Sequence, residues 1–144
     1  MKYKLIMVGL MVILALSLLA CQSGSTGDST EVEFYTCNTF QEQQHVTDEI
    51  TFTVGKGVTI MLCSNPTTGF QWAEEAQISD PEVVEQVSHE YVAPTGDKVG
   101  AAGTEKFSFK ALKPGTTTVY LEYGRDWEGG EKAEWTCTLT ITVK

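Results

Sequence analysis

A chain of 144 residues is long enough for one domain of ordinary size with a single hydrophobic core. It has 19 acidic and 10 basic side chains and a net charge of −9, which argues against nucleic acid or an anionic lipid surface as a partner. Such a charge favours solubility and is compatible with a basic partner protein.

The first 21 residues have the pattern of an export signal. Lys2 and Lys4 give a positive start, an apolar stretch covers residues 5–19, and the segment ends in Leu-Leu-Ala-Cys at residues 18–21. An apolar core this short predicts a secretory signal, not a spanning helix. The ending resembles a bacterial lipoprotein signal, in which the cysteine, here Cys21, is lipidated and becomes the first residue. The alternative is an ordinary signal peptide with an incidental cysteine.

We therefore expect three segments: a lipoprotein signal peptide at residues 1–20, the lipidated cysteine with a flexible linker at 21–30, and one folded domain at 31–144. The linker is rich in Ser, Gly and Thr, a composition typical of a flexible tether. The signal holds two lysines and no acidic residue, so its removal changes the net charge from −9 to −11. We expect the exported protein to be anchored to a membrane by its lipid, either at the cell surface or in the periplasm.

Beyond the lipidation site three cysteines remain, Cys37, Cys63 and Cys137. Export permits disulfides, but three thiols allow at most one internal bridge, and the sequence does not select the pair. The spacings fit no zinc motif, so we expect neither a metal nor a cofactor. The only histidines, His45 and His89, lie in no nucleophile motif, and we interpret them as lone exposed residues.

The folded part alternates between short apolar runs and turn residues, which predicts an all-β protein. Expected strands cover residues 31–35, 50–54, 58–63, 70–73, 83–92, 104–112, 116–123 and 133–143. Residues 39–48 are polar, and we interpret them as irregular. Seven or eight short strands without an amphipathic helix favour an immunoglobulin-like β-sandwich, with a barrel as the alternative.

The period-2 alternation of the strands also predicts which side chains face the core. The inward-facing residues expected from it are Val58, Ile60, Leu62, Trp72, Phe107, Phe109, Val119, Leu121, Trp135, Cys137, Leu139, Ile141 and Val143.

The loop between the third and fourth expected strands is strongly constrained. Pro66 fixes its own φ and pushes Asn65 into an extended conformation, while Gly69 can adopt a positive φ and return the chain to a strand. Two small, uncharged residues that are stiff at χ1 lie between them, Thr67 and Thr68. We expect a blunt, pre-ordered tip that loses little entropy on docking, although a plain turn is the alternative.

Alternate loops of a sandwich gather at one end. Counted from residue 50, the loops at 64–69, 94–104 and 124–132 each join an even-numbered strand to the following odd-numbered strand, so we expect them to share an end. Short turns occupy the other end. Loops gathered on one end of a rigid scaffold are typical of a binding face.

Three motifs, one in each of these loops, resemble the chagasin family of protein inhibitors of papain-like cysteine peptidases, found in protozoa and prokaryotes. The motifs are Asn-Pro-Thr-Thr-Gly-Phe at 65–70, Val-Gly-Ala-Ala-Gly-Thr-Glu-Lys-Phe at 99–107, and Arg-Asp-Trp at 125–127. The resemblance runs from about residue 49 to the end and leaves 31–48 unaccounted for. Asp126 departs from the proline of the family, which implies a less rigid and more acidic loop.

The resemblance implies an immunoglobulin-like domain whose three loops enter the peptidase cleft as a wedge. The first motif would block the catalytic cysteine, the second would bind the non-primed side through its main chain, and Trp127, supported by Arg125, would lie on the aromatic wall of the primed side. The implied peptidase-binding residues are Asn65, Pro66, Thr67, Thr68, Gly69, Phe70, Gly100, Ala101, Ala102, Gly103, Arg125 and Trp127.

Each residue also has a simpler interpretation. Trp127 could fold back onto its own sandwich, Arg125 could pair with Asp126 or Glu128, and the glycines could provide only flexibility.

Three functions remain at this stage. The first hypothesis is a monomeric, membrane-anchored inhibitor that occludes papain-like cysteine peptidases reversibly. The second is a non-inhibitory immunoglobulin-like binding or adhesion module that uses the same loops. An enzyme is disfavoured, because the sequence offers no nucleophile–base pair or metal cluster.

Overall fold

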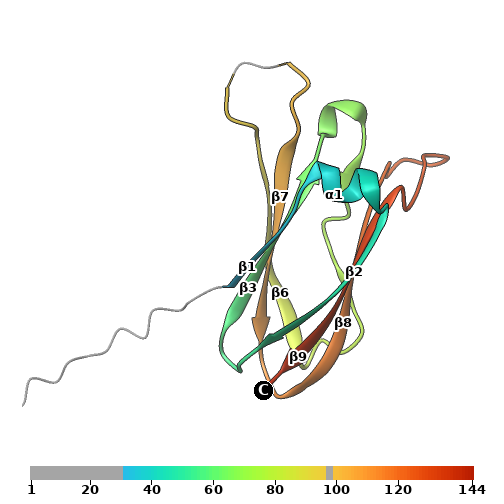
Figure 1. Cartoon of the computed structure of the whole chain (residues 1–144). Helices are drawn as coiled ribbons and strands as arrows, with labels where there is room; N and C mark the ends of the chain where they lie inside the picture. The colour runs from blue at the N-terminus through green and yellow to red at the C-terminus, as the bar shows by residue number, and fades with distance from the viewer. Residues whose placement is uncertain (1–30, 97–98) are drawn as a thin grey trace, which may run out of the picture.

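A computed structural model describes residues 31–96 and 99–144 of the chain. Two β-sheets face each other in these residues and enclose the hydrophobic core (Figure 1). The predicted all-β, immunoglobulin-like sandwich is therefore confirmed. The expected signal peptide, Cys21 and the linker up to residue 30 lie outside the described residues.

The first sheet contains four strands in the order β1-β3-β7-β6. Their bounds are β1 (Glu31–Tyr35), β3 (Gly57–Ser64), β6 (Val84–Val92) and β7 (Gly103–Ala111). The edge strand β1 runs parallel to β3, while β7 pairs antiparallel with both of its neighbours. The prediction of a short edge strand at 31–35 is confirmed.

The second sheet follows the path β2-β9-β8-β4. Its strands are β2 (His45–Phe52), β4 (Gln71–Trp72), β8 (Gly115–Gly124) and β9 (Trp135–Val143). The pair β2–β9 is parallel, and β8 pairs antiparallel with β9 and β4. A further short strand, β5 (Gln77–Ile78), pairs with β8 and lies between the expected strands at 70–73 and 83–92, where no strand is predicted.

The prediction that residues 39–48 are irregular is wrong, because they contain most of a short helix, α1 (Cys37–Glu42), and the start of β2. Thr36 caps the helix, since its Oγ1 accepts a hydrogen bond from the backbone N–H of Thr39, and Phe40 is fully buried. The strand β2 looks polar in sequence because it is an edge strand with most of its side chains in solvent. No helix in the described part of the chain is long and apolar enough to cross a membrane.

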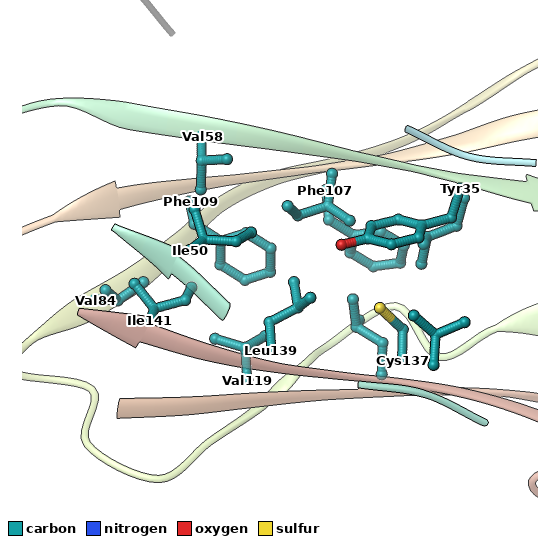
Figure 2. Packing of buried hydrophobic residues seen from close by; sticks show 14 of the residues in the cluster. Tyr35, Ile50, Val58, Val84, Phe107, Phe109, Val119, Cys137, Leu139 and Ile141 are labelled. Carbon is teal, nitrogen blue, oxygen red and sulfur yellow. The ribbon is translucent and has the colours of Figure 1, made fainter. Parts of the chain in front are cut away.

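The core lies between the two sheets and follows the predicted alternation. Figure 2 shows Val58, Phe107 and Phe109 of the first sheet packed toward Val119 and Leu139 of the second. Nearly all of the predicted core residues are buried; Trp135 alone among them remains partly exposed. Each such side chain contributes about 1.5–3 kcal/mol by leaving water. This core provides the rigid support on which the loops are held.

The predicted gathering of three loops at one end is confirmed (Figure 1). The strand register explains it, because Ser64 at the end of β3 pairs with Gly103 at the start of β7, and Gln71 at the start of β4 pairs with Gly124 at the end of β8. The loop after β3 therefore begins beside the loop that precedes β7 and ends beside the loop that follows β8. The helix α1 lies at the same end of the sandwich.

Candidate functional site

We call residues 65–69 the central loop. Most of it is one turn of 3₁₀ helix, η1 (Pro66–Thr68), closed by hydrogen bonds from Thr68 N to Asn65 O (3.1 Å) and from Gly69 N to Pro66 O (2.9 Å). Gly69 ends the turn in the left-handed conformation, with φ of 80°, as its sequence position predicts. Pro66 and both threonines are exposed. The central loop is therefore a shaped tip of small side chains.

Asn65 connects the central loop to its surroundings. Its backbone N–H donates to the hydroxyl of Tyr123 on β8 (3.0 Å), and its Nδ2 donates to the carbonyl of Gly100 (3.1 Å). Its Oδ1 accepts from Oγ1 of Thr67 (2.6 Å). Burial raises the pKa of Tyr123, so its hydroxyl remains neutral at physiological pH. These bonds fix the tip relative to both sheets and to the next loop.

Residues 93–102 form the second loop, of which 97 and 98 lie outside the described residues. Gly100 has a φ of 76° and is exposed beside Ala101 and Ala102. Gly103 is different, because it starts β7, is buried, and has the carbonyl of Val92 only 2.4 Å from the place of a Cβ. Gly103 therefore permits close packing of the scaffold, and its place among the peptidase-binding residues stays a prediction.

Residues 125–134 form the third loop. The guanidinium carbon of Arg125 lies 4.3 Å from the ring centroid of Phe70 and 5.5 Å from that of Trp127. Its Nη1 pairs with Glu131 at 3.1 Å, so the expected alternative of pairing with Asp126 or Glu128 is wrong. The stacked guanidinium thus connects the third loop to the end of the central loop.

Trp127 leaves 50% of its surface exposed, so it does not fold back into its own sandwich. The buried part of its ring lies against Gly69, where a Cβ would fall 2.8 Å from the indole Cη2. An exposed tryptophan held in place by its neighbours is a typical anchor for a protein interface.

Asp126 occupies the position where the resembling family has proline. Its Oδ2 accepts a hydrogen bond from Nε2 of Gln71 on β4 (3.1 Å). The loop is also closed by backbone bonds from Arg125 N to Glu131 O (2.7 Å) and from Gly130 N to Trp127 O (3.0 Å). These bonds restrain the loop in place of the missing proline ring.

A buried carboxylate lies under the central loop. Glu105 is only 2% exposed and accepts hydrogen bonds from Ser64 Oγ (2.6 Å) and Trp72 N (3.1 Å). His89 Nε2 lies 2.7 Å from its other oxygen, and the imidazole stacks on Phe107. The interpretation of His89 as a lone exposed histidine is therefore wrong.

His45, by contrast, is exposed, and its Nδ1 contacts Oγ1 of Thr136 (3.0 Å). The alternation of β7 could have predicted the burial of Glu105, because Glu105 lies on the same face of the strand as the inward-facing Phe107 and Phe109.

The disulfide joins Cys37 to Cys63, with the two Cα atoms 5.1 Å apart. It attaches α1 to β3 one residue before Ser64. Cys137 is the free cysteine among the described residues, and burial raises the pKa of its thiol to about 12. The sequence did not select this pair, because it did not show that α1 reaches the end of β3.

Phe40 of α1 fills the space under the loops. Its ring lies 5.2 Å from Trp72 and 5.2 Å from Trp135, which in turn stacks on Tyr123. Trp72 also donates its indole N–H to the carbonyl of Cys63 (2.9 Å). The segment before residue 49 therefore supports the base of the central loop.

The exposed tip contains hydroxyls, backbone and apolar groups. Across residues 31–96 and 99–144, no group of three or more His, Cys, Asp or Glu side chains could hold a metal. At this end of the sandwich the central loop is joined to the second loop by the Asn65–Gly100 hydrogen bond and contacts the third loop through Gly69 and Trp127.

Comparison with known proteins gives consistent results. The family model described as "Chagasin family peptidase inhibitor I42" matches residues 51–142. Chagasin of Trypanosoma cruzi is 42% identical over 82 residues, which cover 56% of this chain and 74% of chagasin. Amoebiasin-2 of Entamoeba histolytica is 29% identical over 104 residues, which cover 72% of this chain and 82% of that protein.

Two solved structures share the fold. The cysteine protease inhibitor EhICP2 from Entamoeba histolytica has a TM-score of 0.59 and 24% identity, over 81% of this chain and 98% of that chain. PbICP-C, solved in complex with falcipain-2, has a TM-score of 0.56 and 18% identity, over 78% of this chain and 99% of that chain. The alignments cover almost all of both solved chains, so the resemblance extends to the whole sandwich.

Proposed function

This chain belongs to the chagasin family of peptidase inhibitors, and from that premise we propose that it inhibits papain-like cysteine peptidases by reversible occlusion of their active-site cleft. The single observation that carries the proposal is that the three loop motifs form one pre-organised edge. Asn65 binds the carbonyl of Gly100, and Gly69 contacts Trp127, so each outer loop is attached to the central loop.

The central loop acts as the plug. Its tip presents Thr67 and Thr68, which are small enough to enter a narrow slot and carry no charge to desolvate. The backbone is a closed 3₁₀ turn, whereas a cleavable substrate lies extended across a protease cleft. The tip therefore fills the space in front of the catalytic cysteine without presenting a peptide bond in the orientation of a substrate.

The outer loops bind on either side of the plug. Gly100, Ala101 and Ala102 offer backbone groups with little side-chain obstruction, which suits main-chain hydrogen bonds to the non-primed side. Trp127 offers a large apolar surface on the other side, and Arg125 holds its ring in place. Because hydrogen bonds and packing hold the central and third loops in place before docking, these two loops lose little conformational entropy on binding.

A competition experiment tests the mechanism. The immobilised chain is offered two forms of papain. One form has a free active site, and the cleft of the other is filled by a covalently attached peptidyl inhibitor. Occlusion predicts that the free enzyme binds and that the filled enzyme does not. Equal binding of both forms would indicate attachment outside the cleft, and binding of neither would favour a non-inhibitory binding module.

We propose separately that the chain is exported and held at a membrane, at the cell surface or in the periplasm, by a lipid on Cys21. The sequence of residues 1–21 supports this, and the Cys37–Cys63 disulfide is compatible with an oxidising compartment. Labelled fatty acid should enter the wild-type protein and not a Cys21→Ser variant expressed in bacteria. Equal labelling of both would contradict the assignment. We also propose that the chain binds its peptidase as a monomer.

A further inference from the structure

The carboxylate of Glu105 occupies an unusual position, because it is buried where the core alternation of β7 would accept an apolar residue. It lies opposite Leu62 in the β3–β7 register and two residues before the core residue Phe107. Burial of a carboxylate is costly unless the charge is paired and hydrogen-bonded. The partners of this carboxylate therefore indicate what it does.

One oxygen of Glu105 accepts hydrogen bonds from the chain on both sides of the central loop. Its Oε1 accepts from Ser64 Oγ at 2.6 Å, on the residue immediately before the loop, and from Trp72 N at 3.1 Å, where the chain has entered β4. Ser64 is itself fully buried. A single acceptor atom thus fixes the distance across the base of the loop.

The other oxygen of Glu105 is held by His89 from β6. The Nε2–Oε2 distance is 2.7 Å, so the two side chains form a short hydrogen bond. The ring is held against Phe107, with the centroids 4.3 Å apart. His89 therefore fixes the orientation of the carboxylate and offsets part of its desolvation.

We propose that Glu105 is a positioning residue, which holds the central loop in its docking conformation by joining Ser64 to Trp72, and that His89 orients it. The effect on inhibition rests on the proposed function. The effect on the loop of the free protein does not, so the two readouts separate a failure of this inference from a failure of the proposed function.

The first readout is hydrogen–deuterium exchange of the full chain, purified in mild detergent and without a peptidase. In the Glu105→Leu variant, the amides of Thr68 and Gly69 should exchange about tenfold faster, because the turn that protects them loses its support. The amides of Ala111 and Lys144, which are bonded at the opposite end, should not change. Uniformly faster exchange, or unchanged exchange at the tip, would overturn the proposal.

The second readout is the inhibition constant for papain with the same proteins. Glu105→Leu should weaken inhibition by about tenfold or more, as expected for loss of buried charge-assisted hydrogen bonds. Glu105→Gln should recover most of the affinity, because its amide oxygen can still accept from Ser64 and Trp72. Equal loss in both variants, or tight inhibition by a folded Glu105→Leu protein, would contradict the positioning role.

Two further variants complete the test. Ser64→Ala deletes one of the two hydrogen bonds that Glu105 accepts beside the loop, without changing the charge. It should speed amide exchange at the tip and weaken inhibition, each by less than Glu105→Leu does. If Glu105→Leu does not fold, Ser64→Ala tests the positioning role in its place. The matched control is Glu90→Gln, because Glu90 pairs with Lys106 (3.1 Å) on the exposed face of the same two strands. The control should leave both readouts unchanged, and an effect equal to that of Ser64→Ala would contradict the proposal.

Discussion

The indole of Trp127 lies directly against the backbone of Gly69, so close that a Cβ on Gly69 would be 2.8 Å from the indole Cη2. The glycine is thus needed for two reasons: its φ of 80° and the space that the ring occupies. The tip of the central loop and the anchor of the third loop have complementary shapes. Changes at either residue should therefore affect the other.

Substitution of Gly69 by alanine separates these two requirements. Gly55, at the opposite end, has the same φ of 80° but nothing within 4 Å of a Cβ, so Gly55→Ala is a matched control. Both variants should lose about 1–2 kcal/mol of unfolding free energy in urea from the left-handed backbone. Only Gly69→Ala should also weaken peptidase inhibition, because it displaces Trp127. Equal inhibition by both would show that the contact has no role in binding.

Removal of the indole tests the anchor itself. Trp127→Ala should weaken inhibition by about 2 kcal/mol, a typical value for an anchoring aromatic residue of an interface. Leu112→Ala removes an exposed apolar side chain at the opposite end and should leave inhibition unchanged. An unchanged inhibition constant for Trp127→Ala would contradict the role given to this residue.

The size of the tip should also matter. Thr68→Arg places a long charged side chain on the exposed turn and should prevent docking in a narrow slot without unfolding the domain. Thr53→Arg makes the same change at an exposed position of the other end and serves as the control. Circular dichroism verifies the fold of both. If folded Thr68→Arg still inhibits, the central loop is not the plug.

The disulfide should stabilise the domain by restricting the unfolded chain. With a sequence separation of 26 residues, the chain-entropy model gives about 3.5 kcal/mol. A double Cys37→Ala, Cys63→Ala variant should lose stability of this order in urea unfolding. No measurable loss would show that the bridge adds nothing beyond the packing of Phe40.

Cys137 should be chemically silent in the native protein. Because burial, with a smaller contribution from Asp48, raises the pKa of its thiol to about 12, the reactive thiolate is almost absent at pH 8. Ellman's reagent should therefore detect no thiol in the native protein and one after denaturation in a chain that lacks Cys21. Rapid reaction of the native protein would contradict the buried placement.

Sequence alternation predicted the strands well wherever one face of the sheet packs into the core. In β7, for example, Phe107 and Phe109 face the core as predicted, and buried residues alternate with more exposed ones along the whole strand. The helix α1 was not predicted, because six residues are too few to be stable by helix propensity. It depends on the tertiary packing of Phe40 between Trp72 and Trp135 and on the disulfide.

The candidate site was predicted less completely than the fold. The resemblance located the loop motifs, and Pro66 and Gly69 predicted the shape of the tip. The motif alone could not show that Gly103 is buried or that Arg125 pairs with Glu131, because both depend on how neighbouring strands approach each other. The alternation of β7 indicates that Glu105 faces inward, but its hydrogen bonds to Ser64 and Trp72 depend on how those strands approach each other.

The most direct test of occlusion by the loops is titration of papain activity with the domain of residues 31–144 and with its Thr68→Arg, Trp127→Ala double variant. Occlusion by the loops predicts tight, reversible inhibition by the wild-type domain and its loss in the folded double variant. Absence of inhibition by a folded wild-type domain, or equal inhibition by both proteins, would contradict it.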